Sequence, residues 1–129
     1  MVERSKDWIA QSERDLEQAK WSAKGGFYEW ACFIAQQAAE KAVKAVYQAL
    51  HGTCRGHSVS ALLRSLPEGY RPEAPVVEAA MRLGRFYIQT RSPNGFDIGN
   101  PKDYYTETDS EAALEDARTV IAFCNNKLP

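Results

Sequence analysis

The sequence lacks the features that mark several common protein classes. It contains only three cysteines among 129 residues and no Cys-x-x-Cys pair, so free thiols in a reducing cytosol are favoured over a disulfide framework. No apolar run approaches the roughly 20 residues that a membrane span needs. Residues 1–8 also lack the apolar core of a secretory signal. We therefore expect a cytoplasmic protein with no membrane partner.

Motifs for metals and for common cofactors are also missing. The two histidines, His51 and His57, have no cysteine or carboxylate at zinc-ligand spacing. Neither G-x-G-x-x-G nor G-x-x-x-x-G-K-[ST] occurs, which excludes the two common phosphate-cradling loops. The formal net charge of -1 gives no overall basic field that would attract nucleic acid. The sequence thus predicts no metal and no cofactor.

The stretch 27–51 is the most informative part of the chain. It has neither proline nor glycine and is rich in alanine, so a long helix is its favoured conformation. At about 100° per residue, six alanines fall on one narrow stripe that allows close helix packing. These are Ala31, Ala35, Ala38, Ala42, Ala45 and Ala49. We expect this helix to be the central helix of a bundle.

Capping signals locate the other helices. Ser5 is a suitable N-cap for a first helix that ends near Gly25-Gly26, and Ser58 is suitable for a short third helix. Thr108 begins a Ser/Thr-x-x-Glu capping box with Glu111. We expect one domain over residues 1–129, an all-α up-and-down bundle of about five helices. A long Pro- and Gly-containing loop, 88–107, precedes the last helix.

Polar residues along the central helix allow two interpretations. Gln36, Gln37, Glu40, Lys41 and Lys44 can form an ordinary solvated face, with Glu40 and Lys44 as a favourable i,i+4 pair. They can also form the polar floor of a groove, because the rest of the helix is apolar. On the second interpretation, Gln37, Glu40 and Lys44 are candidate ligand-binding residues.

Three further residues are candidates for a site. His57 is either a structural side chain near a helix start or a catalytic group. Arg91 lies at the head of the long loop among aromatic residues that include Tyr104. Such an arginine either packs against these rings or binds a phosphate group. We therefore keep Arg91, His57 and Tyr104 as candidate ligand-binding residues, and Arg91 and His57 as candidate catalytic residues.

Four segments resemble the prokaryotic HEPN domains. They are AQQAAEKAVKAVYQAL, GHSVSALLRSLP, RFYIQTRSPNGFD and YYTETDSEAALEDARTVIAF, in this order. The resemblance implies a helical bundle, usually a homodimer, that is commonly paired with a minimal nucleotidyltransferase in toxin–antitoxin-like systems. It also implies nucleotide binding in some members and metal-independent RNA cleavage in one large branch.

The chain departs from the motifs of both branches. The ribonuclease branch requires Arg-x4-6-His, and Arg91 fills the Arg position, but Ser92 through Asp97 contain no histidine. Cleavage through the 2′-OH needs a group that moves protons near neutral pH, which arginine cannot do. The non-nuclease branch usually reads Arg-Tyr-Pro-Asp, whereas Arg91 is followed here by Ser-Pro-Asn.

The hypothesis that follows is a non-catalytic HEPN binding module. We expect a homodimer, because Trp21, Trp30 and Phe33 fall outside the apolar rows that face the core. The expected partner is a minimal nucleotidyltransferase, and the expected ligand is a nucleotide or another phosphate compound. The alternative is a metal-independent ribonuclease that acts on RNA with a displaced histidine.

Overall fold

Five α-helices make up most of the chain in the computed structural model, which describes residues 3–87, 96 and 98–129. No strand occurs among these described residues, so the all-α prediction is confirmed. The helices and one short 3-10 turn (η3) are α1 (Ser5–Lys24), α2 (Tyr28–Ala49), α3 (Val59–Arg64), α4 (Ala74–Gly84), η3 (Pro101–Asp103) and α5 (Glu107–Lys127).

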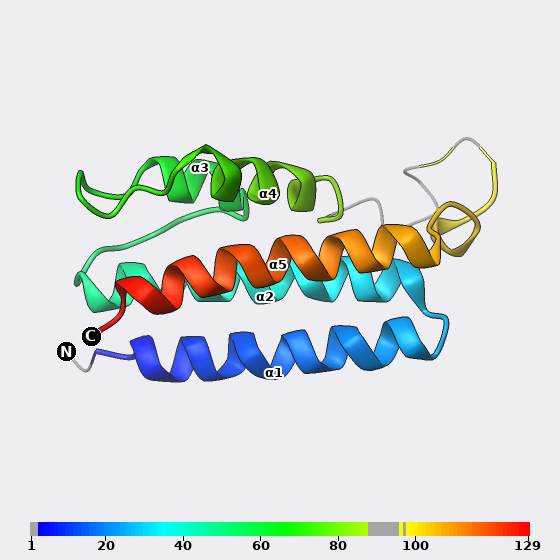
Figure 1. Cartoon of the computed structure of the whole chain (residues 1–129), viewed down its shortest axis with the longest axis horizontal. Helices are drawn as coiled ribbons and strands as arrows, with labels where there is room; N and C mark the ends of the chain where they lie inside the picture. The colour runs from blue at the N-terminus through cyan, green and yellow to red at the C-terminus, as the bar shows by residue number, and fades with distance from the viewer. Residues whose placement is uncertain (1–2, 88–95, 97) are drawn as a thin grey trace.

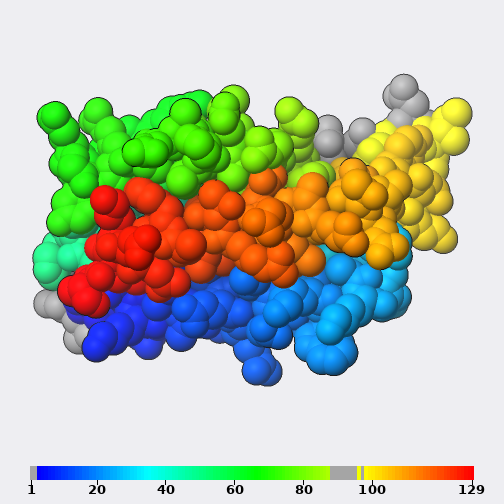
Figure 2. All heavy atoms as spheres, viewed as in Figure 1, coloured from blue at the N-terminus to red at the C-terminus, as the bar shows by residue number. Residues whose placement is uncertain are grey.

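The long helix α2 lies at the centre of the bundle. It contacts α1, α3, α4 and α5, and Figure 1 shows α1 on one side of it and the short α3–α4 pair on the other. In the filled view, α5 covers most of α2 (Figure 2). The start of α1 and the end of α5 lie at the same end of the bundle (Figure 1). The prediction of a central helix is therefore confirmed.

None of the helices in the described part of the chain has the length and apolar character that crossing a bilayer requires.

Alanines form the packed face of α2, as predicted from their spacing. All six are inaccessible except Ala49, which is partly exposed near the helix end. Ala39 is also fully buried, although it lies off the predicted stripe. The hydroxyl of the buried Ser12 on α1 donates to the carbonyl oxygen of Ala38 (2.6 Å). A short serine side chain can reach that carbonyl only because the α1 and α2 backbones pack closely.

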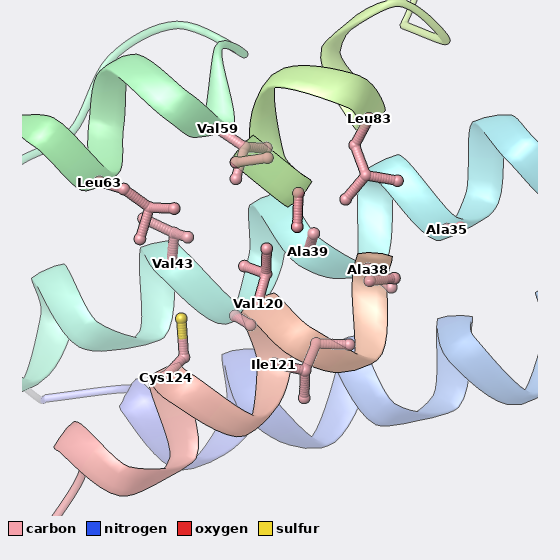
Figure 3. Close-up of a cluster of buried hydrophobic side chains, with 14 of the residues drawn as sticks. Ala35, Ala38, Ala39, Val43, Val59, Leu63, Leu83, Val120, Ile121 and Cys124 are labelled. Atoms are coloured by element: carbon pink, nitrogen blue, oxygen red, sulfur yellow. The ribbon is translucent and has the colours of Figure 1, made fainter. Parts of the chain in front are cut away.

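Larger side chains from the other helices fill the space around the alanines. Figure 3 shows Val59, Leu63 and Leu83 above α2, and Val120, Ile121 and Cys124 from α5 on the other side. The thiols of Cys32 and Cys124 are buried, and both are free, as the sequence predicts. Met81 is half exposed, so it flanks the core without entering it.

Two of the predicted helix caps are wrong by one or two residues. Arg4 is the N-cap of α1, and Ser5 is its first residue, with the backbone N–H of Ser5 donating to the Glu3 carboxylate. Helix α5 begins earlier than expected, with a capping box formed by Thr106 and Asp109. Ser58 is an N-cap as predicted, and its hydroxyl accepts from the Ala61 N–H (3.2 Å).

The connection between α1 and α2 is a tight turn, as the glycine pair predicted. Gly26 has φ 85°, the left-handed conformation in which only glycine is free of strain, whereas Gly25 stays right-handed. The turn makes α1 and α2 an antiparallel hairpin (Figure 1). This hairpin places the N-terminal part of α1 beside the C-terminal half of α2, where the candidate site lies.

Candidate functional site

A cluster of polar side chains lies on α2 and the loop before α3. It consists of Gln36, Glu40 and Lys44, spaced by four residues along α2, and of His57 in the loop; we call it the Glu40 cluster. The spacing of four places the three α2 side chains on one face of the helix. His57 directly precedes the N-cap of α3, so the start of α3 holds the histidine over α2.

The Glu40 carboxylate is buried and has several hydrogen-bond partners. Its side chain is 4% exposed, and Oε2 lies 2.8 Å from the Lys44 ammonium and 3.0 Å from Nδ1 of His57. Gln36 Nε2 donates to Oε1 (3.3 Å). Burial alone would raise the pKa of Glu40, but the hydrogen bonds from Lys44, His57 and Gln36 and the Lys44 charge lower it overall. Glu40 is therefore an anion at neutral pH.

Gln36 connects the cluster to the loop. It is fully buried, and its Nε2 also donates to the backbone carbonyl of His57 (3.2 Å), while its Oε1 accepts from Gln37 (2.7 Å). A solvated polar face is therefore the wrong interpretation for Gln36 and Glu40. Gln37 and Lys44 remain partly exposed and border the cluster. The burial arises because the loop before α3 folds over this part of α2.

The His57 ring is held on two sides and open on a third. It stacks on Tyr87, with ring centroids 4.5 Å apart and an interplanar angle of 19°. Tyr87 contacts Phe33, which in turn contacts Trp30 edge-on (6.2 Å). The His57 side chain is 52% exposed. The histidine therefore presents an accessible polar edge beside a row of aromatic rings.

Lys44 extends the cluster toward α1. Its ammonium lies 5.6 Å from the centre of the Trp8 ring, within the range of a cation–π contact. Trp8, Lys44 and Cys54 are among the residues around a hollow of about 170 Å³. This volume is below the roughly 300 Å³ at which pockets begin to enclose a drug-sized ligand, so the hollow admits only part of a nucleotide.

Comparison with known proteins identifies the family. The family model described as "HEPN domain" matches residues 5–127. The chain belongs to the HEPN family. The resemblance inferred from the four sequence segments is thus confirmed.

Solved structures and a named relative agree with this assignment. The HEPN chain is 40% identical to a Thermus thermophilus protein of known structure (TM-score 0.96), covering 98% of this chain and 100% of that one. It is 38% identical to an archaeal HEPN homologue (TM-score 0.84), covering 99% and 100%. A Methanocaldococcus jannaschii protein named as a candidate toxin is 32% identical over 93% of this chain and 85% of its own length.

The six candidate residues do not all lie together in this HEPN domain. Gln37, Glu40, Lys44 and His57 belong to one region; the sequence grouped the first three on the central helix, and the fold brings His57 to them. Tyr104 lies in a second aromatic cluster, where it stacks on Phe96 (4.3 Å) and its hydroxyl donates to a backbone carbonyl. Arg91 falls outside the described residues, so its role as a site residue stays a prediction.

The sequence did not single out Trp8, Gln36 and Tyr87 as site residues. Gln36 could have been found from its position one helical turn before Glu40. Trp8 and Tyr87 reach the cluster only through the fold, since they lie on α1 and after α4. In the described part of the HEPN domain, no group of three or more His, Cys, Asp or Glu side chains could hold a metal ion.

Proposed function

We propose that this HEPN protein is a dimeric, non-catalytic binding module that partners a minimal nucleotidyltransferase in a toxin–antitoxin-like pair. Its Glu40 cluster is the site at which it contacts a nucleotide or another phosphate compound. The candidate-toxin relative supports the toxin–antitoxin setting. The nucleotidyltransferase partner is proposed because HEPN domains are commonly paired with such a protein.

The position of the histidines is the observation that supports a non-catalytic role for the protein. An Arg-x4-6-His arrangement from Arg91 would need histidine between positions 96 and 98, which are Phe, Asp and Ile. His57 lies instead in the loop before α3, with Nδ1 against Glu40. Without a proton-transferring group at the required spacing, the arginine can bind phosphate but cannot act as a base.

The charges of the Glu40 cluster support a role in binding. The Lys44 ammonium balances the Glu40 carboxylate at 2.8 Å, so no uncompensated negative charge repels an anion. The accessible edge of His57 and the partly exposed Lys44 are then the outward polar groups. Aromatic rings beside them offer a surface on which a base can stack.

Calorimetric titration with AMP tests the binding role. Arg91→Ala and His57→Asn should each weaken binding about ten- to a hundredfold, the value of one charge-assisted contact. His51→Asn is the matched control, because His51 is the other histidine and is exposed. Unchanged far-ultraviolet circular dichroism would show that the variants fold. Equal affinities in all four proteins would contradict the proposal.

Co-expression and sedimentation test the partner and the dimer. Trp21 and Trp30 are 65% and 44% exposed, which is typical of side chains that a partner surface covers. Sedimentation at micromolar concentration should give a mass near twice 14.5 kDa. Co-expressed with a minimal nucleotidyltransferase encoded beside it, the chain should co-purify. A monomer that does not co-purify would remove this part of the proposal.

A second candidate function, RNA cleavage, is favoured by the contact between Glu40 and His57. A carboxylate that holds one imidazole nitrogen leaves the other nitrogen available for proton transfer. The test is a gel assay on RNA with chelator present, using wild type, Arg91→Ala and His57→Ala. Cleavage by the wild type that either substitution abolishes would overturn the binding module in favour of a ribonuclease.

A further inference from the structure

The contact with Glu40 fixes which ring nitrogen of His57 carries a hydrogen. Nδ1 lies 3.0 Å from Oε2 and 3.2 Å from Oε1 of the carboxylate. An ionised carboxylate only accepts hydrogen bonds, so Nδ1 must be the donor. Gln36 supports this arrangement because its Nε2 donates both to the Glu40 carboxylate and to the His57 backbone carbonyl. In the neutral ring, Nε2 therefore bears the lone pair.

Nε2 is the atom available to a ligand. Among the described residues, none forms a hydrogen bond with it, and the side chain is 52% exposed. Stacking on Tyr87 restrains the plane of the ring, and the hydrogen bond to Glu40 fixes which edge faces the carboxylate. The ring is thus oriented before any ligand arrives, which lowers the entropic cost of binding.

The charge balance of the cluster changes when His57 takes up a proton. With neutral His57, Glu40 and Lys44 cancel; with the imidazolium form, the cluster has one net positive charge. Among the described residues, further titratable side chains near the cluster are Tyr87, stacked on the ring, and Tyr47 and Cys54, which line the hollow beside Lys44. Burial raises the pKa of the Cys54 thiol, which keeps it neutral near pH 7.

We propose that His57 binds the phosphate group of a ligand through Nε2–H and that the ring takes up a proton from solvent as the phosphate binds. Buried Glu40 is the positioning residue for this step. The proton adds to the Nε2 lone pair, and the new N–H donates to a phosphate oxygen, with no covalent bond made or broken between protein and ligand. This inference rests on the proposed function, because it gives the mechanism by which the same site recognises an anion.

Calorimetry in buffers of different ionisation enthalpy measures the protons taken up per ligand bound. AMP and inorganic phosphate are the two probes, each titrated at several values between about pH 6 and 8. AMP and inorganic phosphate themselves titrate in this range. The number of protons taken up by wild type is therefore compared with the number taken up by His57→Asn. Asparagine retains an N–H that can reach Glu40 but cannot take up a proton.

The wild type should take up more protons than His57→Asn and should bind about ten- to a hundredfold more tightly, whereas His51→Asn should match the wild type. Glu40→Gln should reduce the number of protons taken up on binding, because the neutral amide no longer fixes the hydrogen of the ring on Nδ1. Circular dichroism would confirm that each variant is folded. A role of Glu40 in structure alone would leave the proton uptake unchanged.

The outcomes separate this inference from the proposed function. Binding with the same proton uptake in wild type and His57→Asn would refute the proton-coupled mechanism and leave the binding module intact. No binding of either probe would refute both. Binding of AMP and inorganic phosphate with equal proton uptake would show that the phosphate group alone is recognised, and uptake with AMP alone would identify a nucleotide site.

Discussion

Replacing Ala38 with leucine should destabilise the protein through overpacking between α1 and α2. Ala38 is fully buried, and its carbonyl oxygen lies 2.6 Å from the Ser12 hydroxyl on α1, so the two backbones leave no room for three more carbon atoms. Insertion of such bulk into a packed core costs about 1–3 kcal/mol. For a domain of 129 residues, each kcal/mol lowers Tm by about 4 °C, so the expected decrease is about 4–12 °C.

The matched control is the same substitution at Ala10, which is exposed on α1. Ala10→Leu should change the free energy of unfolding by no more than about 0.5 kcal/mol, because no packed neighbour has to move. Thermal melts followed by circular dichroism, with urea titrations for the free energies, measure both variants. Equal stabilities for Ala38→Leu and Ala10→Leu would show that α1 and α2 do not pack closely at this point.

Three other predictions concern titration, capping and thiol reactivity. The pKa of Glu40 is lowered in the folded state, so the stability that Glu40 contributes should be present above pH 4.5, its ordinary pKa, and should be lost as the pH falls below that value. In urea titrations, Glu40→Gln should reduce this loss of stability at acid pH. Thr106→Ala should cost about 1 kcal/mol in thermal melts and Thr108→Ala less than about 0.5, a ranking that the opposite cap assignment would reverse. In the native protein a thiol reagent should modify Cys54 first, because burial raises the pKa of the other two cysteines to about 12; faster labelling of those two would contradict their burial.

The helices were predictable because their signals are local. Helix propensity, the glycine pair at the first turn and the Ser58 cap depend on residues a few positions apart. The errors at Ser5 and Thr108 are also local in origin. In the sequence TETDSE, both Thr106-x-x-Asp109 and Thr108-x-x-Glu111 fit a capping box, and only the structure shows that the earlier pair is used.

The site was less predictable because burial on α2 depends on distant segments. Helical periodicity places Gln36 and Glu40 on the polar side of α2, but it cannot show that the loop before α3 covers them. Tyr104 is close in sequence to Arg91, and its ring packs on Phe96 in a cluster separate from the Glu40 cluster. Neighbouring positions in a loop give little information on which rings share a surface.

The alanine-rich face of α2 has a consequence for how stability varies with temperature. Alanine loses no rotamer freedom on burial, and it removes less apolar surface from water than leucine or isoleucine does. The heat-capacity change of unfolding depends mainly on apolar surface exposed, so a seam lined by Ala31, Ala35, Ala38, Ala42 and Ala45 contributes little to it. We therefore expect a flat stability curve, with the free energy of unfolding falling slowly on both sides of its maximum.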